Sequence, residues 1–171
     1  MSSVDLTYEI GLTLLEGVGD ILAKNLIAYC GSAEQVFKTG KTQLEKIPGI
    51  GTYTSNAILQ SKSVLERAEQ EVQFIVDNNI KALFFTDDKF PQRLKNCNDS
   101  PVMLYYKGNA DLNTEKIVAV VGTRTPSPYG RQMAEKFISD LANSGCLIVS
   151  GLAYGIDVTA HKSSLDNGLN T

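Results

Sequence analysis

The sequence has few of the residues that build metal, disulfide or membrane sites. It contains one histidine and three widely spaced cysteines, Cys30, Cys97 and Cys146. These spacings fit neither a disulfide framework nor a zinc site, and three cysteines suit a reducing cytosol. No stretch approaches the ~18 apolar residues of a membrane span, and the N-terminus lacks the basic and apolar regions of a signal peptide. We therefore expect a cytoplasmic protein with no metal, no cofactor and no membrane segment.

An excess of positive charge is also absent. The 171 residues carry 16 basic and 19 acidic side chains, a net charge of −3. A nucleic-acid-binding protein is usually basic, so a nucleic-acid site here must be a local patch. Hydrophobic residues make up 43% and charged residues 20% of the chain. This composition is typical of a globular protein and excludes wholesale disorder.

Residues 1–65 contain an internal repeat. Gly17-Val18-Gly19 recurs 32 positions later as Gly49-Ile50-Gly51, and apolar residues at helical spacing flank each copy. The pattern predicts a helix–turn–helix unit used twice, in a small all-α helix-hairpin-helix (SAM-like) domain. In such units the N–H groups of the turn and of the next helix hold a DNA phosphate without reading bases.

The two turns differ in charge. Asp20 lies beside the first turn, where a phosphate would be repelled, whereas Lys46 precedes the second. Gly49, Ile50 and Gly51 are therefore the better DNA candidate. Because residues 1–65 have a net charge of −1, a helical packing or protein-docking module remains an equal alternative.

Residues 66–171 change from helical to mixed periodicity. After an amphipathic helix that ends at Asn78-Asn79, we expect short strands over residues 82–85 and 102–106. The last third of the sequence predicts a strand, a helix, a second strand and a second helix. Ser127 and Asp157 are the expected caps of the two helices. The strands, residues 117–121 and 147–149, are expected to be buried on both faces, and Met133 and Phe137 to lie on a buried helix face.

This order predicts a parallel sheet with a right-handed crossover. The fold class is therefore α + α/β, a helical domain over residues 1–65 followed by the first half of a Rossmann-like domain over residues 66–171. Asn170-Thr171 has the position of a third strand's first residues, so we expect the chain to be a fragment of a longer protein.

Two loops leave the carboxyl ends of the predicted parallel strands, where ligands bind in open sheets. The first contains Gly122-Thr123-Arg124 and the second begins with Ser150-Gly151. Glycines, hydroxyl donors, helix N-termini and a forked cation suit a phosphate. We expect Lys162, on the following helix, to reach the same crevice.

Other readings of these loops are weaker. The first loop lacks the second glycine of a dinucleotide fingerprint. Ser150 and His161 as nucleophile and base have no assignable orienting carboxylate, and His161 with Asp157 has no third metal ligand. Tyr129 and Tyr154 can either stack on a base or pack against the sheet. We assign no catalytic residue.

The loop motifs resemble those of the DNA-processing protein A (DprA, or Smf) family. The residues that carry the resemblance are the strand and loop from Val118 to Arg124, Tyr129-Gly130, the loop from Ser150 to Asp157, and Ala160-His161-Lys162. Upstream, Phe90-Pro91 and the segment from Ser100 to Gly108 also resemble that family, so the resemblance covers essentially the whole chain.

The resemblance implies a bacterial, non-enzymatic protein of natural transformation (competence) and DNA recombination. Such proteins bind incoming single-stranded DNA and help to load the RecA recombinase onto it, and the resemblance implies a homodimer. By motif match, Arg124 and Lys162 would contact the DNA backbone, and Gly122, Thr123, Ser150 and Gly151 would shape the pocket. The main rival is an enzyme, a phosphoribohydrolase of related nucleotide fold that cleaves nucleoside monophosphates.

Overall fold

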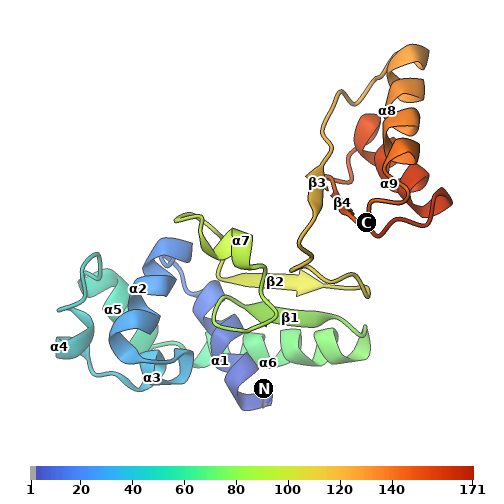
Figure 1. The fold of residues 1–171 in the computed structure, drawn as a ribbon. Helices are drawn as coiled ribbons and strands as arrows, with labels where there is room; N and C mark the ends of the chain where they lie inside the picture. Colours follow the sequence, from blue (N-terminus) through green and yellow to red (C-terminus); the bar gives the residue numbers. More distant parts are fainter. Residues whose placement is uncertain (1–2) are drawn as a thin grey trace. The chain divides into compact units, whose positions relative to one another are not determined.

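The computed structural model describes residues 3–171 and divides the chain into two compact units, Met1–Gly108 and Asn109–Thr171 (Figure 1). Each unit is described by itself. None of the helices in the described part of the chain is long and apolar enough to cross a membrane.

The first unit begins with the helices that the repeat predicts. They are α1 (Ser3–Leu14), α2 (Asp20–Cys30), α3 (Ala33–Lys38), α4 (Lys41–Leu44), α5 (Thr52–Leu59) and α6 (Lys62–Asp77). Gly17 (φ 78°) and Gly49 (φ 88°) have left-handed backbone conformations in the turns that precede α2 and α5, which glycine adopts without steric cost. The sequence repeat therefore corresponds to a repeat in the structure. Each copy consists of a glycine turn with a helix on either side.

A hairpin completes the first unit. Strands β1 (Lys81–Phe84) and β2 (Met103–Tyr106) pair antiparallel, and the short α7 (Gln92–Lys95) lies in the connection between them. Helix α6 packs along α1 (Figure 1). Phe84, Val102 and Met103 share one apolar core with the helices; the other buried members are Ile10, Leu12, Leu15, Val18, Ala23, Leu26, Ile27, Ala33, Val36, Leu44, Ile47, Ile50, Ile58, Ala68 and Ile75.

The hairpin is also tied to the helices by polar contacts. The Asp20 carboxylate accepts a hydrogen bond of 2.9 Å from the Val102 backbone N–H, and Lys24 Nζ donates to Ser100 Oγ at 2.8 Å. For this reason the compact units divide after Gly108, and the domain boundary expected after residue 65 does not coincide with that division.

The second unit has the predicted order of strand, helix, strand and helix. Its elements are β3 (Ile117–Ala119), α8 (Pro128–Asp140), β4 (Leu147–Val149) and α9 (Ile156–Asp166). The two strands pair in parallel with Val118 opposite Ile148, and α8 packs against α9 (Figure 1). Asn170 forms a parallel bridge with Leu147 on the other side of β4, as expected for the first residues of a third strand. The α + α/β fold class is confirmed.

Burial in the second unit differs from the prediction. Val118, Val120 and Ile148 pack with the core beneath α8 and α9, but Val121 is 80% exposed and Val149 is 43% exposed. The reason is that both helices of the unit cover the same face of the strands. The expectation of burial on both faces is therefore wrong for β3 and for the end of β4, whereas the adjacent residues Leu147 and Ile148, on opposite faces of β4, are both buried.

The predicted buried face of α8 is also only partly right. Ile138 is fully buried, and Ala134, Leu141 and Ala142 are partly buried. Met133 and Phe137, however, are 44% and 49% exposed, because the helix packs on β3, β4 and α9 through a narrower stripe than the sequence pattern suggests.

Candidate nucleic-acid interface

The loops that follow β3 and β4 lie directly against each other. The Ile156 N–H donates a hydrogen bond of 3.1 Å to the Thr123 carbonyl oxygen. A β carbon on Gly155 would lie 2.2 Å from that same oxygen, and one on Gly122 would lie 2.6 Å from Ile156 side-chain carbons. Only glycine allows so close an approach at these two positions. The two loops thus share one mouth at the carboxyl ends of the strands.

The second loop is held by hydrogen bonds within the protein. Ser150 Oγ donates to the Val120 carbonyl at 2.6 Å, and the Gly151 N–H donates to the buried Asp157 carboxylate at 3.2 Å. These two predicted ligand donors are therefore engaged in shaping the loop. Asp157, expected as a helix cap, lies in the first turn of α9, and Gly155 is the N-cap residue. The Asp157 carboxylate instead accepts a hydrogen bond from Gly151, in the loop that precedes the helix.

Unused hydrogen-bond donors remain at the mouth. Among the hydrogen bonds of residues 3–171, none involves the backbone N–H groups of Ala153, Tyr154 and Gly155. Thr123 Oγ1 accepts from the Thr125 N–H at 3.2 Å, which leaves its hydroxyl proton available. These donors precede the positive end of the α9 dipole, an arrangement that suits an anion.

Arg124 supplies the positive charge of this site. Its side chain is exposed, and it takes part in no ion pair of the described chain. A free guanidinium can hold a phosphate with two parallel hydrogen bonds. The sequence identified Arg124 and Thr123 but missed the N–H groups of residues 153–155; the signal for them was Gly155, a glycine immediately before a helix.

The start of α8 agrees with its sequence signals. Ser127 is the N-cap residue and its hydroxyl oxygen accepts from the Gly130 N–H at 3.1 Å. Pro128 occupies the first helical position, where a missing N–H has no cost. The first helical turn is thus fixed directly after the loop that carries Arg124.

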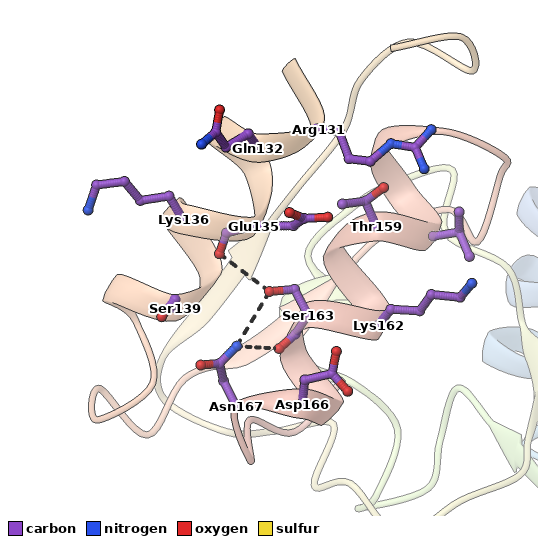
Figure 2. Close-up of a pocket in the computed structure, with 11 residues that line it drawn as sticks. Arg131, Gln132, Glu135, Lys136, Ser139, Thr159, Lys162, Ser163, Asp166 and Asn167 are labelled. Carbon is purple, nitrogen blue, oxygen red and sulfur yellow. Dashed lines mark hydrogen bonds between the residues drawn. The ribbon is translucent and has the colours of Figure 1, made fainter. Parts of the chain in front are cut away.

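Lys162 lies away from the loops, in a groove of about 560 Å³ between α8 and α9. It is six residues beyond the start of α9, which corresponds to about 9 Å along the helix axis. Figure 2 shows Lys162 and Arg131 extending on the same side of this groove. Lys162 and Arg131 are therefore two exposed cations that line one groove, together with the acidic residues Glu135 and Asp166.

The floor of the groove is polar and internally bonded. Ser163 Oγ donates to the Glu135 carbonyl at 3.3 Å, and the Asn167 side chain donates to the Ser163 carbonyl at 2.8 Å (Figure 2). Lys136 pairs with Asp140 at 2.8 Å. Arg131 and Lys162 form none of the ion pairs of the described residues.

The two glycine turns of the first unit have different surroundings. Asp20 and Lys24, which follow the first turn, are bonded to the segment before β2. Within residues 3–171 the second turn has no such side-chain hydrogen bond to that segment: Gly51 caps α5 without a side-chain hydrogen bond, and Ile50 is buried beneath the turn. Lys46 is exposed just before it. The second turn therefore stays the better candidate for a phosphate.

The residues weighed for catalysis have other partners. His161 Nδ1 lies 2.5 Å from Thr171 Oγ1, which donates its proton to the Ile148 carbonyl at 3.0 Å. Ser150 bonds to Val120 instead. Within residues 3–171 no three His, Cys, Asp or Glu side chains are grouped to hold a metal.

Known proteins share this arrangement of loops and strands. The profile of the family described as DNA recombination-mediator protein A matches residues 81–171. The chain belongs to this family. It is 49% identical over 85 residues to DNA processing protein DprA of Streptococcus pneumoniae, covering 50% of the chain and 30% of that protein. It is 31% identical over 172 residues to Protein Smf of Synechocystis, covering 96% of the chain and 42% of that protein.

A solved structure supports the same assignment. The X-ray structure of DNA processing protein A from Streptococcus pneumoniae matches with a TM-score of 0.69 and 28% identity, over 95% of this chain and 55% of that one. The matched regions cover 30% and 42% of the two curated relatives named above, so the chain spans less than half of their length. The resemblance to the DprA/Smf family is confirmed.

Proposed function

We propose that this protein binds single-stranded DNA through phosphates held at the mouth formed by the loops after β3 and β4. The observation that carries the proposal is that Arg124, which forms no ion pair among the described residues, has its backbone against Gly155, next to the unused N–H groups of residues 153–155. Gly122 and Gly151 let the backbone of each loop approach the ligand, and Thr123 adds a hydroxyl donor. Ser150 and Asp157 position the second loop.

Arg131 and Lys162 extend the site along the groove between α8 and α9. Because phosphates repeat along a nucleic-acid strand, two further cations in the groove favour a polymer over a free nucleotide as the ligand. The names of the family and its relatives, DNA recombination mediator and DNA processing protein, agree with a DNA ligand.

The wider role follows from family membership. We propose a non-enzymatic, cytoplasmic protein of bacterial natural transformation that protects incoming single strands and helps to load RecA, acting as a homodimer. These steps rest on the family resemblance, whereas the DNA contact rests on the geometry of the loops.

The test is the affinity of the intact protein for a fluorescent single-stranded oligonucleotide over a series of salt concentrations. Arg124→Ala and Lys162→Ala should each weaken binding in low salt and reduce the slope of log K against log salt by about 0.7, the value for one lost phosphate contact on a single strand. Lys136→Ala is the matched control, since Lys136 lies in the same groove but is paired with Asp140. Unchanged affinity in both test variants would overturn the proposal.

A further inference from the structure

Aromatic and apolar side chains are exposed around the mouth of the site. Tyr154 is 85% exposed, Val121 80%, Leu152 73% and Tyr129 71%. All four belong to the two loops or directly adjoin them, and exposed large apolar side chains at a candidate site are suited to contact a ligand. The exposed fractions also decide between the two roles that the sequence left open for Tyr129 and Tyr154, because rings this exposed are not packed against the sheet.

The backbone of Tyr154 lies close to the backbone of Arg124, the cation of the site. The position of a β carbon on Gly155 would be 2.6 Å from the Arg124 carbonyl carbon and oxygen, so the residue after Tyr154 touches the Arg124 backbone. Adjacent Cα atoms are about 3.8 Å apart. The backbones that carry this ring and this guanidinium therefore lie close together, and both side chains are exposed. A nucleotide presents the complementary pair, a flat base and a phosphate joined by one sugar.

The loop that carries Tyr154 is fixed by the fold. Leu152 has φ 54°, a left-handed conformation that a leucine rarely adopts. The Ser150 and Asp157 hydrogen bonds hold the loop on one side of it, and the Val158 N–H donates to the Ala153 carbonyl at 3.1 Å on the other. The fold thus presents Leu152 and Tyr154 to solvent in a set conformation, which lowers the entropy lost when they meet a ligand.

We propose that the exposed Tyr154 ring stacks on an unpaired base of the strand whose phosphate lies at Arg124. This inference rests on the proposed function and adds the feature that selects single strands. A duplex keeps its bases stacked on one another, so it offers phosphates to Arg124 but no free base face to Tyr154. A stacking ring accepts every base, since each has a π face.

The experiment compares three probes on the intact protein: a single-stranded thymidine oligomer, an abasic oligomer with the same number of phosphates, and a duplex of that length. The wild type should bind the thymidine oligomer more tightly than the abasic one. Tyr154→Ala should weaken binding of the thymidine oligomer by about five- to 150-fold, the range for one lost base stack, and leave the abasic oligomer and duplex unchanged. Tyr154→Phe should retain the wild-type preference.

The controls separate this inference from the proposed function. Tyr105→Ala removes an exposed ring of the other unit and should change no affinity. Arg124→Ala should weaken all three probes. Equal binding of the thymidine and abasic oligomers by the wild type, or an equal loss of both in Tyr154→Ala, overturns the stacking role while DNA binding stands. If the wild type binds none of the probes, both proposals are wrong.

Discussion

Gly155 lies so close to Thr123 that a β carbon on it would be 2.2 Å from the Thr123 carbonyl oxygen. Its φ of 88° is also unfavourable for any residue with a β carbon. Gly145 has a similar φ of 66° but open space around it. The two glycines therefore separate the cost of backbone conformation from the cost of a steric clash.

We expect Gly145→Ala to lower the free energy of unfolding of the second unit by about 1–2 kcal/mol, the cost of a left-handed alanine. Gly155→Ala should cost clearly more, because the loops must also move apart. Urea denaturation followed by circular dichroism measures both. Equal costs would mean that the loops separate without resistance, contrary to the contact seen here.

Glu9 predicts a pH dependence of stability in the first unit. Its side chain is 8% exposed, and Oε2 has no hydrogen-bond partner among the described residues. Burial, followed by the nearby charges of Asp87 and Asp5, raises the pKa of Glu9 from 4.5 to about 7. The folded state therefore binds more protons than the unfolded state between these values, and stability falls as the pH rises from about 4.5 to 7.

The variant Glu9→Gln removes this titration. It should be more stable than the wild type above pH 7, by at most about 3 kcal/mol from a shift of this size, and the difference should shrink toward pH 5. Thermal unfolding over a pH series measures the effect, with the exposed Glu69→Gln as control. A difference that does not change with pH would contradict the raised pKa.

Asp20 links the start of α2 to the hairpin. Its carboxylate accepts from the buried Val102 N–H at 2.9 Å. Asp20→Ala should destabilise the first unit by about 1–3 kcal/mol, because a backbone N–H loses a charged acceptor. Asp20→Asn keeps an acceptor oxygen and should cost less. Denaturant unfolding of both variants measures the link, and a wild-type stability for Asp20→Ala would disprove it.

The second glycine turn gives a prediction for DNA binding by the helical unit. If Gly49, Ile50 and Gly51 hold a phosphate, Lys46→Ala should weaken binding of an oligonucleotide in low salt and reduce the salt slope by about 0.7–0.9. Lys38→Ala is the control, since Lys38 pairs with Glu34 at 2.7 Å. Indistinguishable affinities in the two variants would favour the alternative, a protein-docking module.

The sequence predicted those features that depend on local backbone chemistry. The glycine turns, the Ser127 cap, the helix over α6 and the strand over β4 follow from residues close in the chain, and they lie where expected. The contact between the two loops was also predictable, because the carboxyl ends of neighbouring parallel strands share one edge of a sheet.

The features that sequence reasoning missed depend on residues far apart in the chain. The attachment of the hairpin to the helices through Asp20 and Val102 joins residues 82 positions apart, and no periodicity reveals it. The exposure of Phe137 depends on which face of the sheet each helix covers. The position of Lys162 depends on the rotation of α9 about its axis, which the order of elements leaves undetermined.

The two apolar cores have a consequence for ligand-linked stability. Among the described residues, the core of the first unit has 18 buried members and that of the second has five. Because separate cores unfold as separate cooperative segments, amide hydrogen exchange should be slower in the first unit than in the second. An oligonucleotide that occupies the mouth should then slow amide exchange chiefly in β3, α8, β4 and α9, since ligand binding stabilises only the segment that holds the ligand.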